Sequence, residues 1–210
     1  MLFDLANIRG GGEYGKAWHD AGKREHKQNC YTDFCAAARF LHDDLKVTSP
    51  SKTAIMGGSN GGLLVSACAL REPHLFRSVV AAVGVLDMYK FHRFSIGAAW
   101  RSDFGDPDVE AQFRVLQQYS PLHNVRANVQ YPAMLITTGD HDDRVVPLHS
   151  HKFVATLQAT SPDFGGPFLE RVEVAAGHGA GKPTSKVIDE ACDTYSFLAL
   201  SLGATFRPDA

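Results

Sequence analysis

No stretch of 18 consecutive apolar residues occurs in the sequence, which excludes a membrane-spanning helix on length alone. Residues 1–12 lack a basic segment followed by a long apolar one, so we expect no secretory signal peptide. Neither sign of charge predominates, since 21 Lys and Arg stand against 23 Asp and Glu. A chain without a basic excess is not expected to bind nucleic acid or an anionic membrane.

Cysteine is also scarce, and its four positions form no C-x-x-C pair. Three of them lie in apolar or helical stretches, as reduced structural thiols do. Disulfide frameworks and zinc sites need paired or regularly spaced cysteines, so we expect neither. Reduced thiols and the missing signal peptide together predict a cytoplasmic protein. The four cysteines are Cys30, Cys35, Cys68 and Cys192.

The chain alternates between short apolar runs and amphipathic stretches. With 210 residues it is long enough for one domain, expected over residues 1–210. Short runs rich in Val, Ile and Ala predict strands, and three- and four-residue spacing of apolar residues predicts helices. The expected strands are 53–56, 76–85, 133–138 and 169–175, and the expected helices are 31–46, 63–70, 148–157 and 183–202. This alternation predicts an α/β fold with a mostly parallel sheet.

One segment, 86–130, interrupts that alternation with aromatic residues and polar turns. An excursion of this length in an α/β fold is usually a lid or a substrate-binding insertion.

A glycine-rich turn lies between the first expected strand and the helix after it. It reads Gly57-Gly58-Ser59-Asn60-Gly61-Gly62 and contains the G-x-S-x-G pattern of a nucleophile elbow. Small neighbours permit the sharp turn that projects the Ser59 hydroxyl, and the backbone N–H of Asn60 would face a developing oxyanion. A phosphate-binding loop is the alternative interpretation of such a turn.

A serine nucleophile needs a base, and the base needs an orienting carboxylate. Asp140, Asp142 and Asp143 follow the strand 133–138, and His178 follows the strand 169–175 between glycines. The carboxyl ends of parallel strands are where open α/β sheets place their sites. The order Ser, Asp, His is that of α/β hydrolases, and the residues alone leave the three aspartates open.

Two further patterns suggest other ligands but fit them poorly. Residues 10–16 nearly match a P-loop, but Ala17 stands where a Ser or Thr should ligate Mg²⁺, and Glu13 would repel phosphate. His149 and His151 are two residues apart in an expected helix and so face different ways, which does not suit a shared metal. We therefore expect no metal and no organic cofactor.

Four motifs together resemble the catalytic domain of the prolyl oligopeptidase family. They are residues 7–15 (NIRGGGEYG), 57–62 (GGSNGG), 140–147 (DHDDRVVP) and 176–183 (AGHGAGKP). The resemblance covers nearly the whole chain and implies an α/β-hydrolase fold, which complete members carry beneath a β-propeller that admits short peptides. It implies that Ser59 is the nucleophile, His178 the base, and Asp142, rather than Asp140 or Asp143, the orienting acid.

The resemblance also implies cleavage of short peptides on the carboxyl side of proline. Trp100 matches the tryptophan that stacks on the prolyl ring, and Arg144 matches the arginine that donates to a substrate carbonyl. Phe104 stands where we would expect a tyrosine. Trypsin-like relatives tend to carry alanine after the nucleophile, where this chain has Asn60. The remaining expected wall residues are Phe104, Val85, Ile96 and Val145.

The chain departs from the family at its beginning. It starts in an expected strand, Leu2 to Ile8, and lacks the propeller, the earlier strands and the segment that supplies a second oxyanion donor. We therefore expect its partner to be the missing N-terminal segment of the same protein, and expect weak activity without it. The alternatives are a serine esterase or dipeptidyl exopeptidase, or a catalytically silent fragment.

Overall fold

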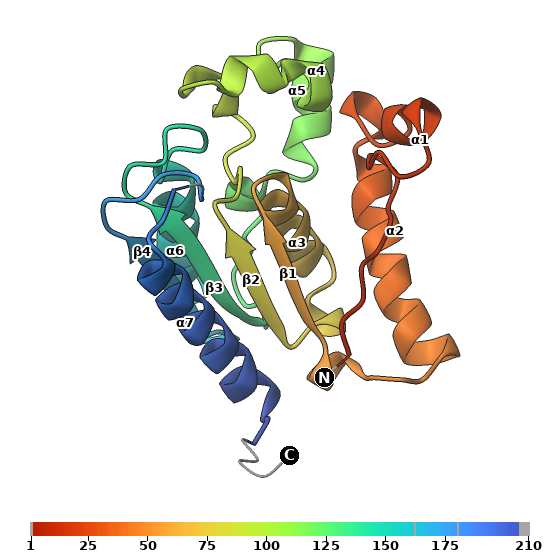
Figure 1. Cartoon of the computed structure of the whole chain (residues 1–210). Helices are drawn as coiled ribbons and strands as arrows, with labels where there is room; N and C mark the ends of the chain where they lie inside the picture. Colours follow the sequence, from red (N-terminus) through yellow and green to blue (C-terminus); the bar gives the residue numbers. More distant parts are fainter. Residues whose placement is uncertain (1, 162, 180, 206–210) are drawn as a thin grey trace.

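The computed structural model describes residues 2–161, 163–179 and 181–205, so Ala180 of the 176–183 motif lies outside the described residues. Its centre is a parallel sheet in the order β1-β2-β3-β4 (Figure 1). The strands are β1 (Ala54–Gly58), β2 (Ser78–Ala82), β3 (Ala133–Gly139) and β4 (Phe168–Glu173). The helices are α1 (Lys16–Asp20), α2 (Gln28–Arg39), α3 (Asn60–Arg71), α4 (Arg101–Phe104), α5 (Glu110–Gln117), α6 (Leu148–Thr160) and α7 (Thr184–Leu202).

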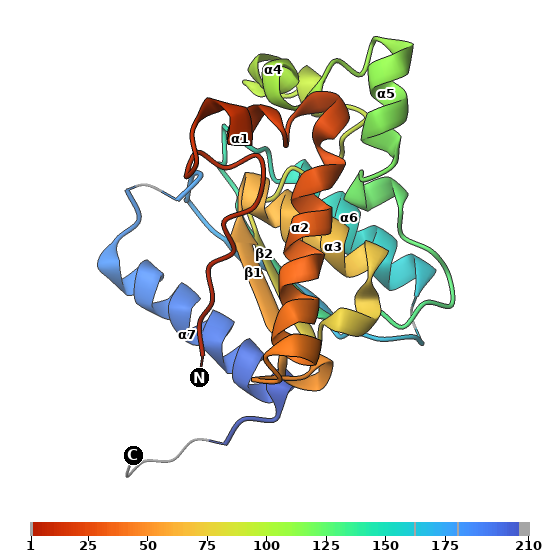
Figure 2. The same cartoon turned by 90° about the vertical axis from the view of Figure 1, so that its right-hand side faces the viewer.

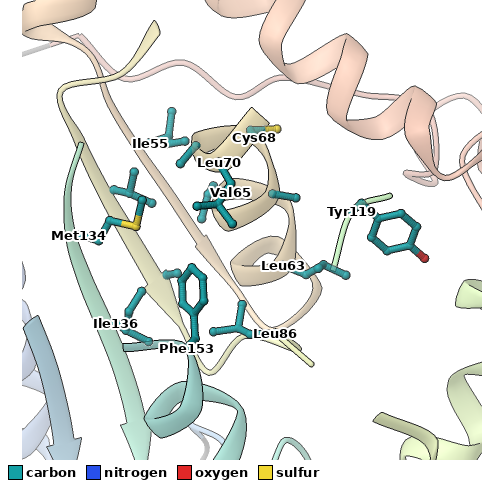
Figure 3. Close-up of a cluster of buried hydrophobic side chains, with 14 of the residues drawn as sticks. Ile55, Leu63, Val65, Cys68, Leu70, Leu86, Tyr119, Met134, Ile136 and Phe153 are labelled. Atoms are coloured by element: carbon teal, nitrogen blue, oxygen red, sulfur yellow. The ribbon is translucent and has the colours of Figure 1, made fainter. Parts of the chain in front are cut away.

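Helices cover both faces of this sheet. Side chains alternate along each strand, so Val79 and Met134 face the core under α3 and α6, whereas Val80 and Leu135 face α7. Figure 3 shows the larger core, where Phe153 from α6 lies beside Ile136 of β3 and Leu86, and Leu63 and Val65 of α3 belong to the same cluster. The α/β fold predicted from the alternation of elements is confirmed.

The strand and helix boundaries shift by a few residues from those expected. β1 extends to Gly58 rather than ending at Met56, and β2 is confined to Ser78–Ala82 within the expected 76–85. The expected helix 31–46 is α2, followed by a π-helical turn over Phe40–Asp44. Within the described part of the chain, no helix combines the length and hydropathy that crossing a membrane requires.

The expected strand over Leu2–Ile8 is wrong. Residues 2–8 have no regular secondary structure and run beside α2 (Figure 2), with Leu2, Phe3 and Leu5 more than 60% exposed. A strand needs a neighbour that accepts and donates its backbone hydrogen bonds. Among the described strands, β1 pairs with β2 alone, so the apolar residues of this segment join no sheet.

The excursion at residues 86–130 is here called the cap, and its part with α4 and α5 lies over the carboxyl ends of the strands (Figure 1, top). Its last residues return toward the amino ends, where Arg126 donates to the Leu70 carbonyl at the end of α3. The cap contains α4, α5 and short 3-10 turns. Its apolar residues Met88, Phe91 and Leu116 are fully buried in the same core as the sheet. The backbone N–H of Leu122 donates to the Leu86 carbonyl at 3.0 Å, which closes the base of the cap. The cap is therefore packed onto the sheet edge where the sequence predicts the site.

Candidate active site

Ser59 occupies the sharp turn between β1 and α3. Its backbone has φ 56° and ψ −114°, a conformation that non-glycine residues rarely adopt. The turn is fixed because the Ser59 N–H donates to the Ala82 carbonyl of β2 at 2.8 Å. A Cβ on Gly57 would lie 2.3 Å from the Gly61 carbonyl oxygen, so this position requires glycine. The strained turn exposes the Ser59 hydroxyl at the carboxyl edge of the sheet.

The structure brings the Ser59, His178 and Asp142 side chains into one hydrogen-bonded chain. His178 Nε2 lies 3.1 Å from Ser59 Oγ, and His178 Nδ1 lies 2.7 Å from Asp142 Oδ2. Because a carboxylate accepts, it favours the tautomer with the proton on Nδ1, which leaves the Nε2 lone pair facing the hydroxyl. This arrangement can remove a proton from Ser59 as its oxygen attacks an electrophile.

The Asp142 carboxylate is completely buried and has partners on both oxygens. Its second oxygen, Oδ1, accepts the backbone N–H groups of Arg144 at 3.0 Å and Val145 at 2.9 Å. Buried carboxylates without such donors are strongly disfavoured. The turn that follows β3 therefore holds this carboxylate in place and aims its other oxygen at His178.

Of the three candidate aspartates, only Asp142 contacts the histidine. The Asp140 carboxylate instead accepts from His141 Nδ1 at 2.6 Å, and this hydrogen bond is the main cause that lowers the pKa of Asp140 to about 2. Asp143 is exposed, and its carbonyl accepts a hydrogen bond from the Ser95 hydroxyl of the cap.

The loop after β3 and the loop after β4 are joined directly. The His141 N–H donates to the Ala176 carbonyl at 3.0 Å, and the Ala176 N–H donates to Asp140 Oδ1 at 3.2 Å. The backbones approach so closely that a Cβ on Gly139 would lie 2.3 Å from the Ala176 oxygen. Since Asp142 and His178 lie on these two loops, the joint sets their separation.

A cavity of about 210 Å³ opens beside Ser59 under the cap. The indole of Trp100 lies edge-on to Phe104, with ring centroids 6.5 Å apart. Asn60, the first residue of α3, also lines the cavity, and backbone N–H groups in a first helical turn have no partner within the helix. The lining residues are Ser59, Asn60, Val85, Ile96, Trp100, Asp103, Phe104 and Arg144.

Two residues differ from the expected cavity wall. Val145 is expected there, but it is not among the lining residues; it is 2% exposed in the hydrophobic core, and its backbone N–H donates to Asp142. Asp103 lines the cavity, although sequence reasoning missed it. Its place in the short helix that joins Trp100 to Phe104 was the one available signal.

The N-terminal motif and the cysteines singled out in the sequence do not line this cavity. Residues 6–9 border a larger cavity of about 480 Å³ beside α2, where Arg9 forms a bidentate pair with Asp33. Cys30, Cys35 and Cys68 are buried and Cys192 is exposed, and all four are free thiols. Across the described residues, no three His, Cys, Asp or Glu side chains are grouped to hold a metal ion.

Comparison with known proteins places this geometry in a family. The profile of the prolyl oligopeptidase family matches residues 1–205. Prolyl oligopeptidase A of Galerina marginata is 50% identical over 208 residues, which cover 99% of this chain and 28% of that protein. The prolyl endopeptidase of Dictyostelium discoideum is 50% identical over 200 residues, covering 94% of this chain and 26% of that protein.

Solved structures agree in fold as well as sequence. Prolyl oligopeptidase B from Galerina marginata, an S577A mutant bound to a 35mer substrate, superimposes with a TM-score of 0.91 at 46% identity, over 95% of this chain and 28% of that one. A post-proline cleaving enzyme from Rickettsia typhi superimposes with a TM-score of 0.88 at 35% identity, over 95% of this chain and 28% of that one. The chain spans about a quarter of the length of these relatives, and it belongs to the prolyl oligopeptidase family.

Proposed function

We propose that this chain carries the catalytic groups of a serine peptidase that cleaves short peptides on the carboxyl side of proline. The observation that carries the proposal is the continuous chain of hydrogen bonds from Asp142 through His178 to Ser59, beside a cavity walled by aromatic side chains. Family membership supports the same reaction, since relatives are named prolyl oligopeptidase and prolyl endopeptidase.

In this proposal, acyl transfer begins with Ser59. Its Oγ attacks the carbonyl carbon of the scissile bond while His178 Nε2 takes the hydroxyl proton. The carbonyl oxygen becomes an oxyanion, which accepts a hydrogen bond from the Asn60 N–H at the start of α3. The C–N bond then breaks as His178 returns the proton to the leaving amine, leaving an ester on Ser59.

Hydrolysis of that ester repeats the same proton transfers with water. His178 takes a proton from the attacking water, the C–O bond to Ser59 breaks, and the serine oxygen recovers the proton. Throughout, Asp142 stays ionised, since its role is to hold the Nδ1 proton and stabilise the imidazolium. Because His178 is only partly exposed and Asp142 is fully buried, the electrostatic stabilisation acts with little screening by water.

Selectivity for proline would come from the cap. The flat face of Trp100 can stack on a pyrrolidine ring, with Phe104 behind it and Val85 and Ile96 beside it. The exposed Arg144 guanidinium presents several fixed donors to a substrate carbonyl. In this proposal a further N-terminal segment of the same protein restricts entry to short peptides and supplies a second oxyanion donor.

The test is covalent labelling of the purified chain with a fluorophosphonate probe, followed by peptide mapping. We expect modification of Ser59, its loss in Ser59→Ala, and unchanged labelling in Ser51→Ala, whose side chain is exposed and distant in the fold. A chain that retains its circular dichroism spectrum but is modified elsewhere, or nowhere, refutes the proposal. Comparing prolyl and alanyl amides, and simple esters, then separates a post-proline peptidase from an esterase.

A further inference from the structure

A buried lysine lies directly beneath the candidate specificity cavity. Lys27, at the start of α2, is 4% exposed, and a lysine so buried is rare unless it is paired. Its Nζ lies 3.0 Å from Asp103 Oδ2 and 4.9 Å from the centroid of the Phe104 ring. The two residues are 76 positions apart in the sequence, and their pair joins the N-terminal part of the chain to the cap. Figure 2 shows α4 above α1 and the upper end of α2.

The partner of this lysine belongs to the cavity itself. Among the eight described residues that line it, Asp103 is the one acid and Arg144 the one base. Asp103 lines the cavity with a side chain that is 28% exposed, whereas Lys27, whose side chain is 5% exposed, is not among the lining residues. A group in the cavity would therefore meet the carboxylate before the ammonium. A cationic substrate side chain in the cavity would meet Arg144, Lys27 and Asp103 together, a net positive surrounding.

We propose that Lys27 determines specificity by neutralising Asp103, so that the cavity selects an uncharged residue such as proline and rejects lysine or arginine. This inference rests on the proposed function and adds a residue that touches no substrate. Without Lys27, the Asp103 carboxylate would be free to pair with a cation entering from the Ser59 side, as charges in a poorly solvated site do. The same loss would remove one of the contacts that hold α4, which carries Phe104, although the Arg24 side chain would still donate to the Ser102 carbonyl of that helix.

Stability alone is a weak explanation for the pair. The free-energy cost of removing two charges from water offsets most of their mutual attraction. Proteins in which apolar residues of similar volume replace a buried ion pair are often as stable. The Lys27–Asp103 pair links the residue before α2 to the helix that lines the cavity, where a charge acts directly on the substrate. Its position therefore fits selectivity better than general support of the fold.

The experiment measures how fast Ser59 reacts with two peptidyl diphenyl phosphonates that differ only in one residue, proline or lysine, at the position entering the cavity. In Lys27→Met, we expect the lysyl-to-prolyl ratio of second-order rate constants to rise about tenfold or more over the unsubstituted chain. Lys27→Arg, which keeps the charge, and Lys16→Met, which removes an exposed lysine, should leave the ratio unchanged. Adding Asp103→Asn to Lys27→Met should reverse the rise.

An unchanged ratio in Lys27→Met, at an unfolding midpoint close to that of the unsubstituted chain, overturns the inference. If Lys27→Met does not fold, Asp103→Asn alone decides the question: it leaves Lys27 unneutralised, so the ratio should fall, and an unchanged or higher ratio overturns the inference. The non-peptidic fluorophosphonate separates the two proposals. Failure of the folded chain to react with it refutes the proposed function, whereas reaction with an insensitive ratio refutes only the role of Lys27.

Discussion

Acid should destabilise this chain through one buried histidine, His149. It lies in the first turn of α6, next to the loop that carries Asp142, and is 1% exposed. Its Nδ1 accepts the Asp87 backbone N–H at 3.0 Å, a contact that requires this nitrogen to be unprotonated. Burial is the main cause that lowers the pKa of His149 from its ordinary 6.5 to about 4, and the nearby Asp87 charge opposes it.

The direction and size of the effect follow from that difference in pKa. The unfolded chain binds the proton first, so the stabilisation is complete above pH 6.5 and is lost as the pH falls from 6.5 to 4. With these two pKa values, the free energy of unfolding is about 2 kcal/mol lower at pH 5 than at pH 7.5. That is a large share of the stability of an ordinary domain.

The assay is urea unfolding at pH 7.5 and pH 5, followed by circular dichroism. In His149→Asn an amide oxygen can still accept from the Asp87 N–H, but the titrating ring is gone. Between pH 7.5 and pH 5, the free energy of unfolding of this variant should therefore fall by about 2 kcal/mol less than that of the unsubstituted chain. His151→Asn is the matched control, since His151 lies in the same helix with its side chain half exposed. Equal losses in the unsubstituted chain and in His149→Asn would refute this account.

Three further predictions concern the loops and the cavity. In Gly139→Ala, the new Cβ would lie 2.3 Å from the Ala176 oxygen, so the two loops must separate. The unfolding midpoint and the rate of fluorophosphonate labelling should therefore both fall, and no change in either would contradict the close approach. In Asp142→Asn, the amide no longer fixes the His178 tautomer, and labelling should slow by as much as about 10⁴-fold at an unchanged fold; a loss below tenfold would exclude the orienting role. In Trp100→Ala, a prolyl substrate should lose about 0.5–1.5 kcal/mol of stacking beyond lost burial. The ratio of kcat/KM for prolyl over alanyl amides should therefore fall. A constant ratio would mean that the Trp100 indole only packs in the core and does not contact the substrate.

The sequence predicted those parts of the fold that depend on local pattern. Buried strands and amphipathic helices have their own periodicity, so β1, β3 and α6 were expected within a few residues of their bounds. The turn at Ser59 was also predictable, since close approach of backbones demands glycine at Gly57. Choosing Asp142 over its neighbours needed the family resemblance, because the three aspartates differ only in direction within one short loop.

What the sequence could not predict depends on contacts between distant residues. The segment 2–8 has the apolar content of a strand but joins no sheet, because pairing is a property of two segments rather than one. Val145 follows Arg144 directly in the sequence, yet only Arg144 lines the cavity, because the direction of each side chain depends on the turn that the Asp142 carboxylate holds. The Lys27–Asp103 pair has no local signal at all, because its members are separated by 76 residues.

Under the proposed function, catalysis and selectivity depend on different parts of this chain. The strands and the joined loops hold the reacting groups. The Ser59 N–H donates to the Ala82 carbonyl of β2, and Gly139 lies against the backbone of Ala176. The cap carries most of the cavity wall, and Lys27, the residue before α2, pairs with Asp103 of that wall. A change at Gly139 should therefore slow prolyl and lysyl phosphonates by the same factor, because both need the same base. A change at Lys27 should alter their ratio while the fluorophosphonate, which does not occupy the cavity with a side chain, reacts as before.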